Sequence, residues 1–400
     1  MRERVVLAYS GGLDTTVAVG WLAEERGLDV IAVAVDVGQR EDMEAIRERA
    51  LKAGALEAAV VDAAEEFASD FVLPALHANA LYQQKYPLVS ALSRPLICRH
   101  LGRVAAARGA AYIAHGCTGK GNDQVRFEVS LGALAPGLEV LAPVRDWRMT
   151  RDQTIEYGLA RGLPVPVGPA APYSIDENLW GRAIECGMLE DPMEAAPDEV
   201  WKLTAETLDA PSEPAFCEIA FVEGTPVALD GRGMSPAGLI REVSDAAGRY
   251  GFGRVDMIED RVVGIKSREV YEAPGALALI LAHADLEEMT LDREVLRTKR
   301  LLEQRYAQLV YDGYWYSPLR EALDAFNAYT QAHVSGVVRL RLEPGCVRVV
   351  GRSAERSLYD AALATYDEGD AFDHSAAEGF VKLWGLPIKI WARAHRREEK

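Results

Sequence analysis

The chain has 400 residues, about half of them apolar and about a quarter charged, and its formal net charge at pH 7 is −17. This length favours two domains, and the composition is typical of a soluble globular protein. The negative charge argues against a nucleic-acid partner, because phosphate backbones are bound by basic surfaces.

The first apolar run, residues 5–9, is too short for the core of a signal peptide. No other run approaches the roughly 20 apolar residues of a membrane span. The five cysteines are scattered, odd in number and without a C-x-x-C pair, so neither a disulfide framework nor a structural zinc site is expected. These features together predict a reduced, cytoplasmic protein that does not bind membranes.

Short apolar runs alternate with amphipathic stretches through the first half of the chain. The sequence predicts strands over 5–9, 30–35, 58–61, 111–114 and 140–142. It predicts helices from residue 13 onward and over 41–53, 65–76 and 92–108. This alternation predicts an α/β fold with a mostly parallel, Rossmann-like sheet covered on both faces. Ligands bind such sheets beyond the carboxyl ends of the strands, where this chain has polar, glycine-rich segments.

Residues 161–174 contain four prolines and two glycines, which cannot continue a regular element. We therefore expect a first domain over 1–167 and a second, α+β domain over 168–375. The sequence predicts strands over 216–222, 262–266, 337–342 and 347–350 and helices over 291–310 and 318–334.

The last segment, residues 376–400, is expected to be a C-terminal arm. An isolated tail has no reason to carry Trp384 and Trp391. The arm therefore packs either on another subunit or on its own domain, and the sequence leaves both alternatives open.

The segment SGGLDTT, Ser10 to Thr16, joins the first predicted strand to the first helix. Gly11 and Gly12 permit a tight turn and a close approach of the backbone to a ligand. The N–H groups and dipole at the start of the helix favour an anion, so the segment predicts a phosphate-binding loop. It has Asp14 but not the lysine of a Walker-type loop. The alternative is a strand-to-helix turn capped by Ser10.

The loop resembles the S-G-G-x-D-[ST] signature of the PP-loop ATP pyrophosphatases. Five longer segments, in order, resemble the argininosuccinate synthase family: residues 8–16, 115–128, 172–182, 189–192 and 253–272. The resemblance implies that the ureido oxygen of citrulline attacks the α-phosphate of ATP, giving citrullyl-AMP and pyrophosphate. The amine of aspartate would then displace AMP. The resemblance further implies Mg²⁺ with the ATP and a homotetramer whose C-terminal arm reaches a neighbouring subunit.

The same resemblance implies roles for individual residues. Asp14 and Asp123 would be catalytic, and no residue is assigned to a metal. The residues implied for ATP are Ala8, Tyr9, Ser10, Gly11, Gly12, Leu13, Asp14, Thr15, Thr16 and Gly116. Those implied for aspartate are Thr118, Asn122 and Asp123. Those implied for citrulline are Tyr86, Asn122, Arg126, Ser174, Glu259 and Tyr271.

Two positions depart from the commonest pattern of the family. Ala91 and Ala183 stand where many members have a serine that holds citrulline. A lost hydroxyl hydrogen bond is worth about 0.5–1.5 kcal/mol net, so citrulline would bind more weakly but would still bind. Water, Ser90 or Ser93 could compensate.

Cys117 is interpreted as a packing residue, because no partner cysteine suggests sulfur transfer. His115 and Lys120 receive no role. Two other functions stay open from the sequence. One is another PP-loop synthetase, such as one that amidates a carboxylate, although no candidate glutaminase segment is present. The other is a non-catalytic nucleotide-binding protein of the same fold.

Overall fold

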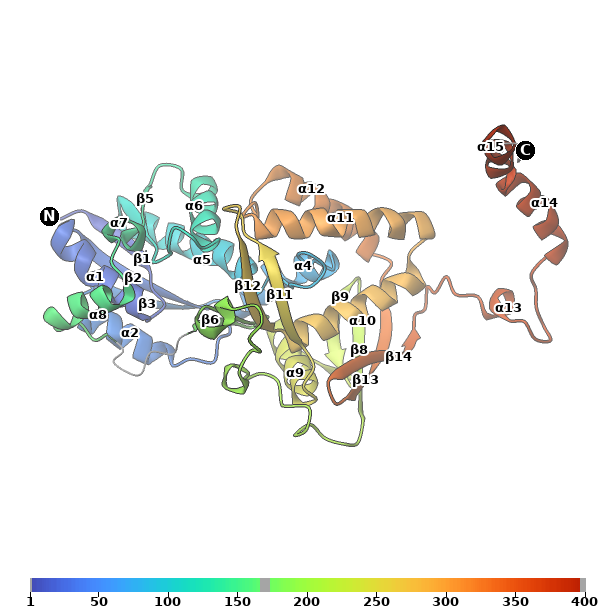
Figure 1. Ribbon diagram of the computed structural model, residues 1–400, viewed down its shortest axis with the longest axis horizontal. Helices are drawn as coiled ribbons and strands as arrows, with labels where there is room; N and C mark the ends of the chain where they lie inside the picture. Colours follow the sequence, from blue (N-terminus) through green and yellow to red (C-terminus); the bar gives the residue numbers. More distant parts are fainter. Residues whose placement is uncertain (1, 166–172, 396–400) are drawn as a thin grey trace. The chain divides into compact units, whose positions relative to one another are not determined.

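The structure is a computed structural model that describes residues 2–165 and 173–395 (Figure 1). The chain forms two compact units, one ending at Arg356 and one starting at Ser357. The domain boundary predicted between 167 and 168 lies outside the described residues and stays a prediction. Within the two described ranges, no helix is long and apolar enough to cross a membrane.

The first sheet contains parallel strands in the order β3-β2-β1-β4-β5. They are β1 (Arg4–Ala8), β2 (Asp29–Asp36), β3 (Glu57–Asp62), β4 (Tyr112–Ala114) and β5 (Glu139–Leu141). The prediction of an α/β fold with a parallel sheet is therefore confirmed. The winding reverses after β3, because the chain returns past β1 to form β4. A crevice for ligands is expected where β1 and β4 end side by side.

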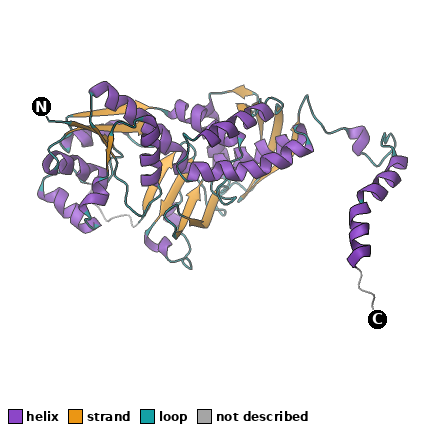
Figure 2. Ribbon diagram, turned by 90° about the horizontal axis from the view of Figure 1, so that it is seen from above, coloured by secondary structure: helices purple, strands orange, loops and turns teal. Residues whose placement is uncertain are grey.

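Both faces of this sheet are covered by helices (Figure 2). Val5 and Leu7 of β1 pack in one buried cluster with residues of α1 (Leu13–Glu25) and α2 (Met43–Lys52). Val6 points to the opposite face, into a cluster that contains residues of α5 (Val89–Arg108). The alternation along β1 thus follows the period of two that a strand imposes on its side chains.

Other helices of the first half differ in detail from the predictions. The helix predicted over 65–76 forms as three consecutive pieces, with a π-helical turn in the middle. The pieces are α3 (Ala64–Phe67), η1 (Ala68–Val72) and α4 (Leu73–His77). The sequence did not predict α6 (Asp123–Leu134), α7 (Pro143–Trp147) or α8 (Arg151–Ala160).

The rest of the first unit contains two antiparallel sheets, in the orders β10-β9-β8-β13-β14 and β11-β12-β7-β6. The first comprises β8 (Ala215–Val222), β9 (Thr225–Leu229), β10 (Arg232–Gly233), β13 (Gly336–Glu343) and β14 (Cys346–Ser353). The second comprises β6 (Ser174–Asn178), β7 (Gly181–Glu185), β11 (Arg254–Asp260) and β12 (Lys266–Glu272).

The strand predicted over 262–266 is wrong, because this apolar run forms the turn between β11 and β12. Gly264 has a φ of +88°, which reverses the chain. Val262, Val263 and Ile265 are exposed and do not join a core. The strands predicted over 216–222, 337–342 and 347–350 are confirmed.

The helices of this part are α9 (Pro236–Arg249), α10 (Pro274–Thr290), α11 (Arg293–Tyr311) and α12 (Pro318–Gln331), with short 3₁₀ turns η2 (Gly187–Glu190) and η3 (Asp198–Val200). Of these, α9 and α10 pack on the antiparallel sheets, whereas α11 and α12 pack on each other and on α5 and α4. The helices predicted over 291–310 and 318–334 are confirmed within a few residues at each end. The second unit contains α13 (Ala361–Ala364), α14 (His374–Trp384) and α15 (Leu386–His395), in which no residue is buried.

Hydrogen bonds from the turn between β6 and β7 attach the second antiparallel sheet to the parallel one. Asn178 Nδ2 donates to Val89 O over 2.7 Å, and Trp180 Nε1 donates to Pro87 O over 2.8 Å. Leu179 N donates to Val37 O, just beyond the end of β2. These contacts bring β6 and β7 to the carboxyl edge of the parallel sheet.

Glu272, at the end of β12, is the centre of a buried polar cluster. Its carboxylate accepts from Arg182 Nη1 over 2.5 Å and from the backbone N–H groups of Lys202, Leu203 and Thr204. Arg182 and Glu272 are 1% and 0% exposed. The buried Arg182 is paired with Glu272 and with Glu177, whose Oε2 lies 3.0 Å from Arg182 Nε, and these contacts offset the cost of burying the charges.

Replacing Glu272 by alanine should lower the free energy of unfolding by about 3–5 kcal/mol, because Arg182 would keep only the partly exposed Glu177 as counter-ion and three backbone N–H groups would lose their acceptor. Denaturant unfolding of the full chain measures this loss. The matched control is Glu218→Ala, which breaks the exposed pair with Arg339 and should cost at most about 1 kcal/mol. Equal losses in the two variants would contradict the importance given to Glu272.

Candidate active site

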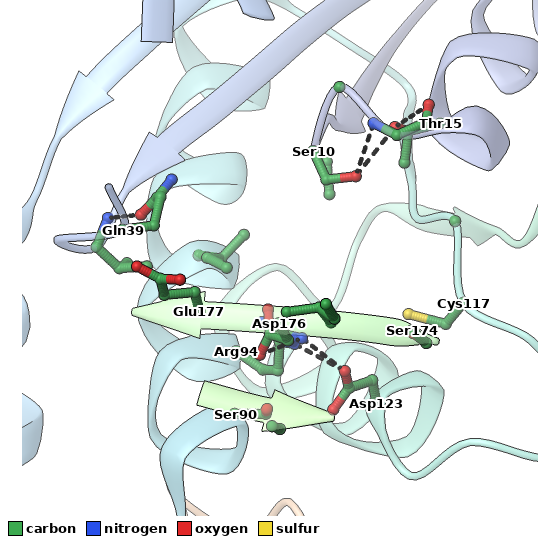
Figure 3. A pocket seen from close by; sticks show the side chains of 18 of the residues that line it. Ser10, Thr15, Gln39, Ser90, Arg94, Cys117, Asp123, Ser174, Asp176 and Glu177 are labelled. Atoms are coloured by element: carbon green, nitrogen blue, oxygen red, sulfur yellow. Dashed lines mark hydrogen bonds and ion pairs between the residues drawn. The ribbon is translucent and has the colours of Figure 1, made fainter. Parts of the chain in front are cut away.

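A cavity of about 950 Å³ lies at the carboxyl ends of β1 and β4. One wall is the loop that leads into α1, and β6, with Asp176 and Glu177, lies opposite it (Figure 3). Residues of β7, β11 and β12 also line the cavity. Sixteen of the residues implied by the resemblance line this cavity: Ala8, Tyr9, Ser10, Gly11, Gly12, Asp14, Thr15, Tyr86, Gly116, Thr118, Asn122, Asp123, Arg126, Ser174, Glu259 and Tyr271. Segments far apart in the sequence thus meet at one place.

Leu13 and Thr16 are the two predicted site residues that do not line the cavity. Leu13 packs in a small apolar cluster with Val17 and Val165. The Thr16 hydroxyl is buried and lies 3.0 Å from the hydroxyl of Tyr9. Their side chains therefore stabilise the loop from the side that faces away from the cavity.

The loop at residues 10–12 leaves the start of α1 open toward the cavity. Gly11 has a φ of +75°, a conformation that favours glycine, and Gly12 is the residue before the helix. No side chain caps the first turn of α1, so the alternative of a turn capped by Ser10 does not describe it. The Ser10 hydroxyl accepts a long hydrogen bond from Gly12 N, at 3.4 Å, and lies 3.1 Å from the Thr15 hydroxyl. The free N–H groups and the helix dipole make this end of α1 suitable for a phosphate.

Two further charges lie beside the loop. Arg49 of α2 donates to Gly11 O over 2.5 Å and lines the cavity, which places a cation beside a loop that has no lysine of its own. Burial raises the pKa of Asp14, an effect that the charge of Arg151 partly opposes. The sequence analysis missed Arg49, because nothing local links α2 to the loop.

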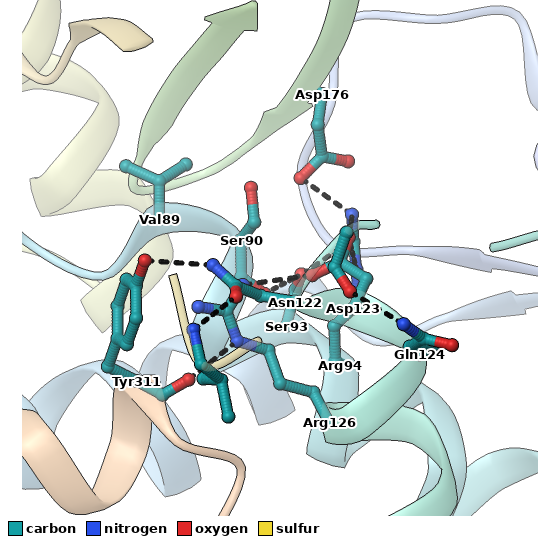
Figure 4. Close-up of polar contacts among 12 residues, drawn as sticks. Val89, Ser90, Ser93, Arg94, Asn122, Asp123, Gln124, Arg126, Asp176 and Tyr311 are labelled. Carbon is teal, nitrogen blue, oxygen red and sulfur yellow. Dashed lines mark hydrogen bonds and ion pairs between the residues drawn. The ribbon is translucent and has the colours of Figure 1, made fainter. Parts of the chain in front are cut away.

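Asp123, the first residue of α6, is held by two guanidinium groups (Figure 4). Arg94 Nη2 lies 2.7 Å from Asp123 Oδ2 and 3.0 Å from Asp176 Oδ2, and Arg126 Nη1 lies 2.9 Å from Asp123 Oδ1. Burial opposes ionisation of Asp123, but the two arginines outweigh it and hold its pKa below the ordinary value. Asp123 is therefore an ionised acceptor at neutral pH.

Asn122 connects this cluster to the second half of the unit. Its Nδ2 donates to the Tyr311 hydroxyl over 2.8 Å, and its Oδ1 accepts from Val262 N over 2.9 Å. The sequence suggested that this amide donates to and accepts from two ligands. In the structure one donor and one acceptor position are engaged by the protein, which leaves one N–H and one lone pair for a ligand.

The residues predicted to hold citrulline come from facing elements. The rings of Tyr86 and Tyr271 stack with centroids 4.1 Å apart, and the Tyr271 hydroxyl lies 2.9 Å from Glu259 Oε1. Arg126 Nη2 and Glu259 Oε2 are buried atoms without a hydrogen-bond partner among the described residues. The cavity therefore offers one cationic and one carboxyl group that are each free to bind a ligand. Ser174 is exposed at the start of β6.

Two alanines that depart from the family pattern have different surroundings. Ala183 lines the cavity and pairs with Tyr271 across β7 and β12. Ala91 is 1% exposed and is not among the residues that line the cavity, whereas its neighbour Ser90 is. The Ser93 hydroxyl is engaged with Ser90 O and Arg94. Of the two serines suggested as substitutes, only Ser90 can therefore reach a ligand.

Three residues of the segment that follows β4 also have defined positions: His115, Cys117 and Lys120. His115 is fully buried, with Nε2 3.4 Å from Glu128 Oε1 and Nδ1 accepting from Cys117 N. Cys117 lines the cavity, but burial raises the pKa of its thiol, which therefore stays protonated. Lys120 O accepts from Arg261 over 3.4 Å.

Several charged residues that line the cavity were missed by the sequence analysis. They are Arg40, Glu41, Arg49, Arg94, Asp176, Glu177, Arg182, Glu185, Lys202, Arg261 and Glu269. Many lie inside segments already singled out, but their side chains meet only through long-range folding. No local signal distinguished them from solvated charges.

Comparisons with known proteins agree with this geometry. Residues 4–164 match the family model described as arginosuccinate synthase N-terminal HUP domain, and residues 173–391 match the arginosuccinate synthase C-terminal domain. The argininosuccinate synthase of Oceanobacillus iheyensis is 54% identical over 389 residues, which cover 97% of this chain and 93% of that protein. The argininosuccinate synthase of Gloeobacter violaceus is 55% identical over 395 residues, covering 98% of this chain and 99% of that protein.

The parallel sheet, the open helix start and the N-terminal match define an ATP-using synthetase of the HUP class. The matches across both halves are more specific: the chain belongs to the argininosuccinate synthase family. The resemblance that the five sequence segments indicated is confirmed.

Replacing Gly11 by alanine should raise the KM for ATP about 5- to 30-fold. The left-handed backbone costs a residue with a Cβ roughly 1–2 kcal/mol, and that Cβ would lie 3.1 Å from Ile46 and 3.2 Å from Arg49. Initial-rate kinetics at saturating amino-acid concentrations measure the change.

The matched control is Gly27→Ala, which has a similar φ of +65° but no heavy atom within 4 Å of the added Cβ and no place in the cavity. It should lower stability and leave the KM for ATP unchanged. A Gly11→Ala variant with normal ATP kinetics would count against a phosphate-binding role of this loop.

Proposed function

We propose that this chain catalyses the ATP-dependent condensation of citrulline and aspartate to argininosuccinate, releasing AMP and pyrophosphate. One observation carries the proposal most strongly. A helix start suited to phosphate and a free cation–carboxyl pair, Arg126 and Glu259, open into the same cavity. Membership of the family favours this ligase over the two other functions left open from the sequence, a different synthetase and a non-catalytic protein.

In this proposal the loop at residues 10–12 and the first turn of α1 bind the phosphates of ATP through backbone N–H groups. Arg49 adds the positive charge that the loop itself lacks. Mg²⁺ would be bound mainly by the phosphates and water, because it usually takes only one or two carboxylates from a protein. Asp14 is the carboxylate in the loop that could contribute, and no cluster of three or more metal-ligating side chains occurs among the described residues.

Asp123 is proposed to bind and orient the amino group of aspartate. Its lowered pKa makes it a weak base, so its contribution is to hold an ammonium or amine in position rather than to remove a proton. Arg94 and Arg126 fix the carboxylate on two sides, which limits where the amine can lie. The nitrogen attacks as the neutral amine, after its ammonium form has lost a proton to solvent. A bond forms between this nitrogen and the activated ureido carbon, the bond from that carbon to the AMP oxygen breaks, and AMP leaves.

The experiment that tests this function is the release of pyrophosphate and AMP from ATP, with both amino acids present and with each left out. Full turnover should require citrulline and aspartate together. Citrulline alone should support pyrophosphate release without steady AMP release, which reports the first half-reaction. No release under any combination would overturn the proposal.

Restoring a hydroxyl at Ala183 should tighten citrulline binding about two- to tenfold, the value of one net hydrogen bond. The position lines the cavity beside Tyr271, so Ala183→Ser presents its hydroxyl to the ligand. Calorimetric titration with citrulline measures the affinity.

The comparison variant is Ala91→Ser, which restores the other hydroxyl of the common pattern at a buried position that does not line the cavity. Its citrulline affinity should stay within twofold of the parent protein. The reverse ranking of the two variants would contradict the placement of citrulline against β7.

We also propose that the chain forms a homotetramer in which the C-terminal arm packs on another subunit. Large apolar side chains of this unit are exposed: Phe380, Val381, Leu383, Trp384, Ile388, Ile390 and Trp391. Exposed apolar groups at this density mark an interaction surface more often than a free one. A cytoplasmic location stays a prediction from the sequence.

Deleting residues 376–400 should lower the mass of the assembly, because α14 and α15 carry most of this apolar surface. Light scattering coupled to size-exclusion chromatography measures the mass. The control deletes only residues 396–400. The number of subunits per assembly should then be the same as for the full chain. A tetramer that persists without residues 376–400 would remove the arm from the proposal.

A further inference from the structure

Two glutamates on the wall of the cavity share one phenol. The Tyr271 hydroxyl lies 2.9 Å from Glu259 Oε1 and 2.8 Å from Glu269 Oε2. All three side chains line the cavity, and the residues are 1%, 1% and 9% exposed for Tyr271, Glu259 and Glu269. They belong to the paired strands β11 and β12. The two carboxyl groups are therefore held close together with little water around them.

The number of hydrogens at this phenol limits the charge of the pair. A phenol has one hydrogen to donate, so it can satisfy only one of two ionised carboxylates. The second short contact requires a carboxyl group that is protonated and donates, either to the phenol oxygen or to the other carboxylate. The geometry therefore calls for one proton on the pair.

The neighbouring arginine decides which glutamate carries that proton. Arg261 Nη2 lies 2.9 Å from Glu269 Oε1 and also contacts Glu185, so Glu269 has a cationic partner. Glu259 has none within ion-pair distance among the described residues. Burial first, and the adjacent Glu269 second, raise the pKa of Glu259, whereas the pKa of Glu269 is held below its ordinary value despite burial. Glu259 is thus the neutral member.

Groups that face Glu259 from other elements do not change this balance. The charge of Arg126 of α6 lowers the pKa of Glu259, but this effect is smaller than the rise caused by burial and by Glu269, and Arg126 Nη1 is paired with Asp123. Burial raises the pKa of each nearby tyrosine, so these phenols are neutral near pH 7. The groups facing Glu259 are Tyr82, Tyr86, Arg126, Glu269, Tyr271 and Tyr311.

The free atoms at this wall match the two charges of an amino acid. Arg126 Nη2 and Glu259 Oε2 are both buried, both in cavity-lining residues, and both without a hydrogen-bond partner in the described part of the chain. A carboxylate suits the guanidinium nitrogen, and an ammonium suits the glutamate oxygen. An ammonium beside Glu259 favours its ionised form and so favours loss of the shared proton.

We propose that Glu259 and Glu269 share one proton in the free protein and release it to solvent when the ammonium group of citrulline binds beside Glu259. The inference rests on the proposed function and adds a role for Glu269, which positions the proton and selects for a cationic ligand. The charge balances, because the ammonium keeps its hydrogens and replaces the departing proton as partner of the carboxyl pair. The affinity for citrulline therefore rises with pH, by up to about tenfold per unit, while the pair still holds its proton.

Calorimetric titration of the full chain with citrulline near pH 7, in buffers of different ionisation enthalpy, counts the protons released. The parent protein should release close to one proton per citrulline bound. Glu269→Gln keeps the size of the side chain but removes its charge and leaves the Tyr271 hydroxyl to donate to Glu259 alone, so Glu259 holds its proton less tightly, fewer protons are released and the pH dependence flattens. Glu242→Gln, at an exposed position on α9, is the matched control and should behave as the parent.

A second ligand isolates the ammonium group. δ-Ureidovaleric acid is citrulline without its amino group, and it should bind more weakly and release no proton. Equal proton release by the parent and the Glu269→Gln variant, or by the two ligands, would overturn the proposal.

A measurement without any ligand separates this inference from the proposed function. The infrared spectrum of the free protein at neutral pH should contain the carbonyl stretch of a buried protonated carboxyl group, which Glu269→Gln weakens and Glu242→Gln retains. Absence of that band in the parent protein overturns the shared proton, whether or not citrulline binds. Presence of the band together with failure of citrulline to bind would support the shared proton and count against the proposed function instead.

Discussion

The ion pairs of Arg94 and Arg126 with Asp123 fix the positions of the cavity walls relative to one another. Arg94 comes from α5, Asp123 and Arg126 from α6, and Asp176 from β6, so one ion cluster joins the parallel sheet's helices to the antiparallel sheet. Partly buried charges are stable only in such mutual contact, which makes the cluster costly to rearrange. The position of every ligand group in the cavity depends on this arrangement.

Charge inside the cavity is distributed unevenly, and this gives each region a different chemistry. The end near α1 has backbone N–H groups and Arg49, which attract phosphate. The opposite wall carries Glu185, Glu259 and Glu269, of which Glu269 is ionised in the free protein and Glu259 becomes ionised when an ammonium group binds beside it. A nucleotide and an amino acid entering the same cavity are therefore sorted by charge before any specific hydrogen bond forms.

Much of the fold was predictable because it depends on local pattern. The strands of the parallel sheet were found from short apolar runs, and the phosphate loop from two glycines between a strand and a helix. The apolar run at 262–266 was misread as a strand, since hydrophobicity alone does not distinguish a strand from an exposed turn that contains Gly264. The helix α6 was missed because the glycines and polar residues before it suggested a longer loop.

The candidate site was predictable only in part, for a different physical reason. Motifs found by resemblance identified Asp123, Arg126 and Glu259, but not the partners that set their charge. Arg94 is 29 residues from Asp123 in sequence, and Asp176 lies on another sheet. Glu269 looked like one charge in a polar strand until the fold brought it to the same phenol as Glu259. Pairings of this kind depend on tertiary contacts, which no periodicity in the sequence encodes.

The attachment of the turn between β6 and β7 to α5 and β2 has a mechanical consequence. It consists of a few hydrogen bonds, from Asn178, Leu179 and Trp180, between elements that each have their own sheet or helix layer. Leu179 and Trp180 also pack in the buried cluster that contains residues of β2 and α5, so the joint fixes where β6 and β7 lie beside the first sheet. Substitutions at the joint can therefore change the affinities for two substrates together, because they change where β6 and β7 lie in the cavity wall.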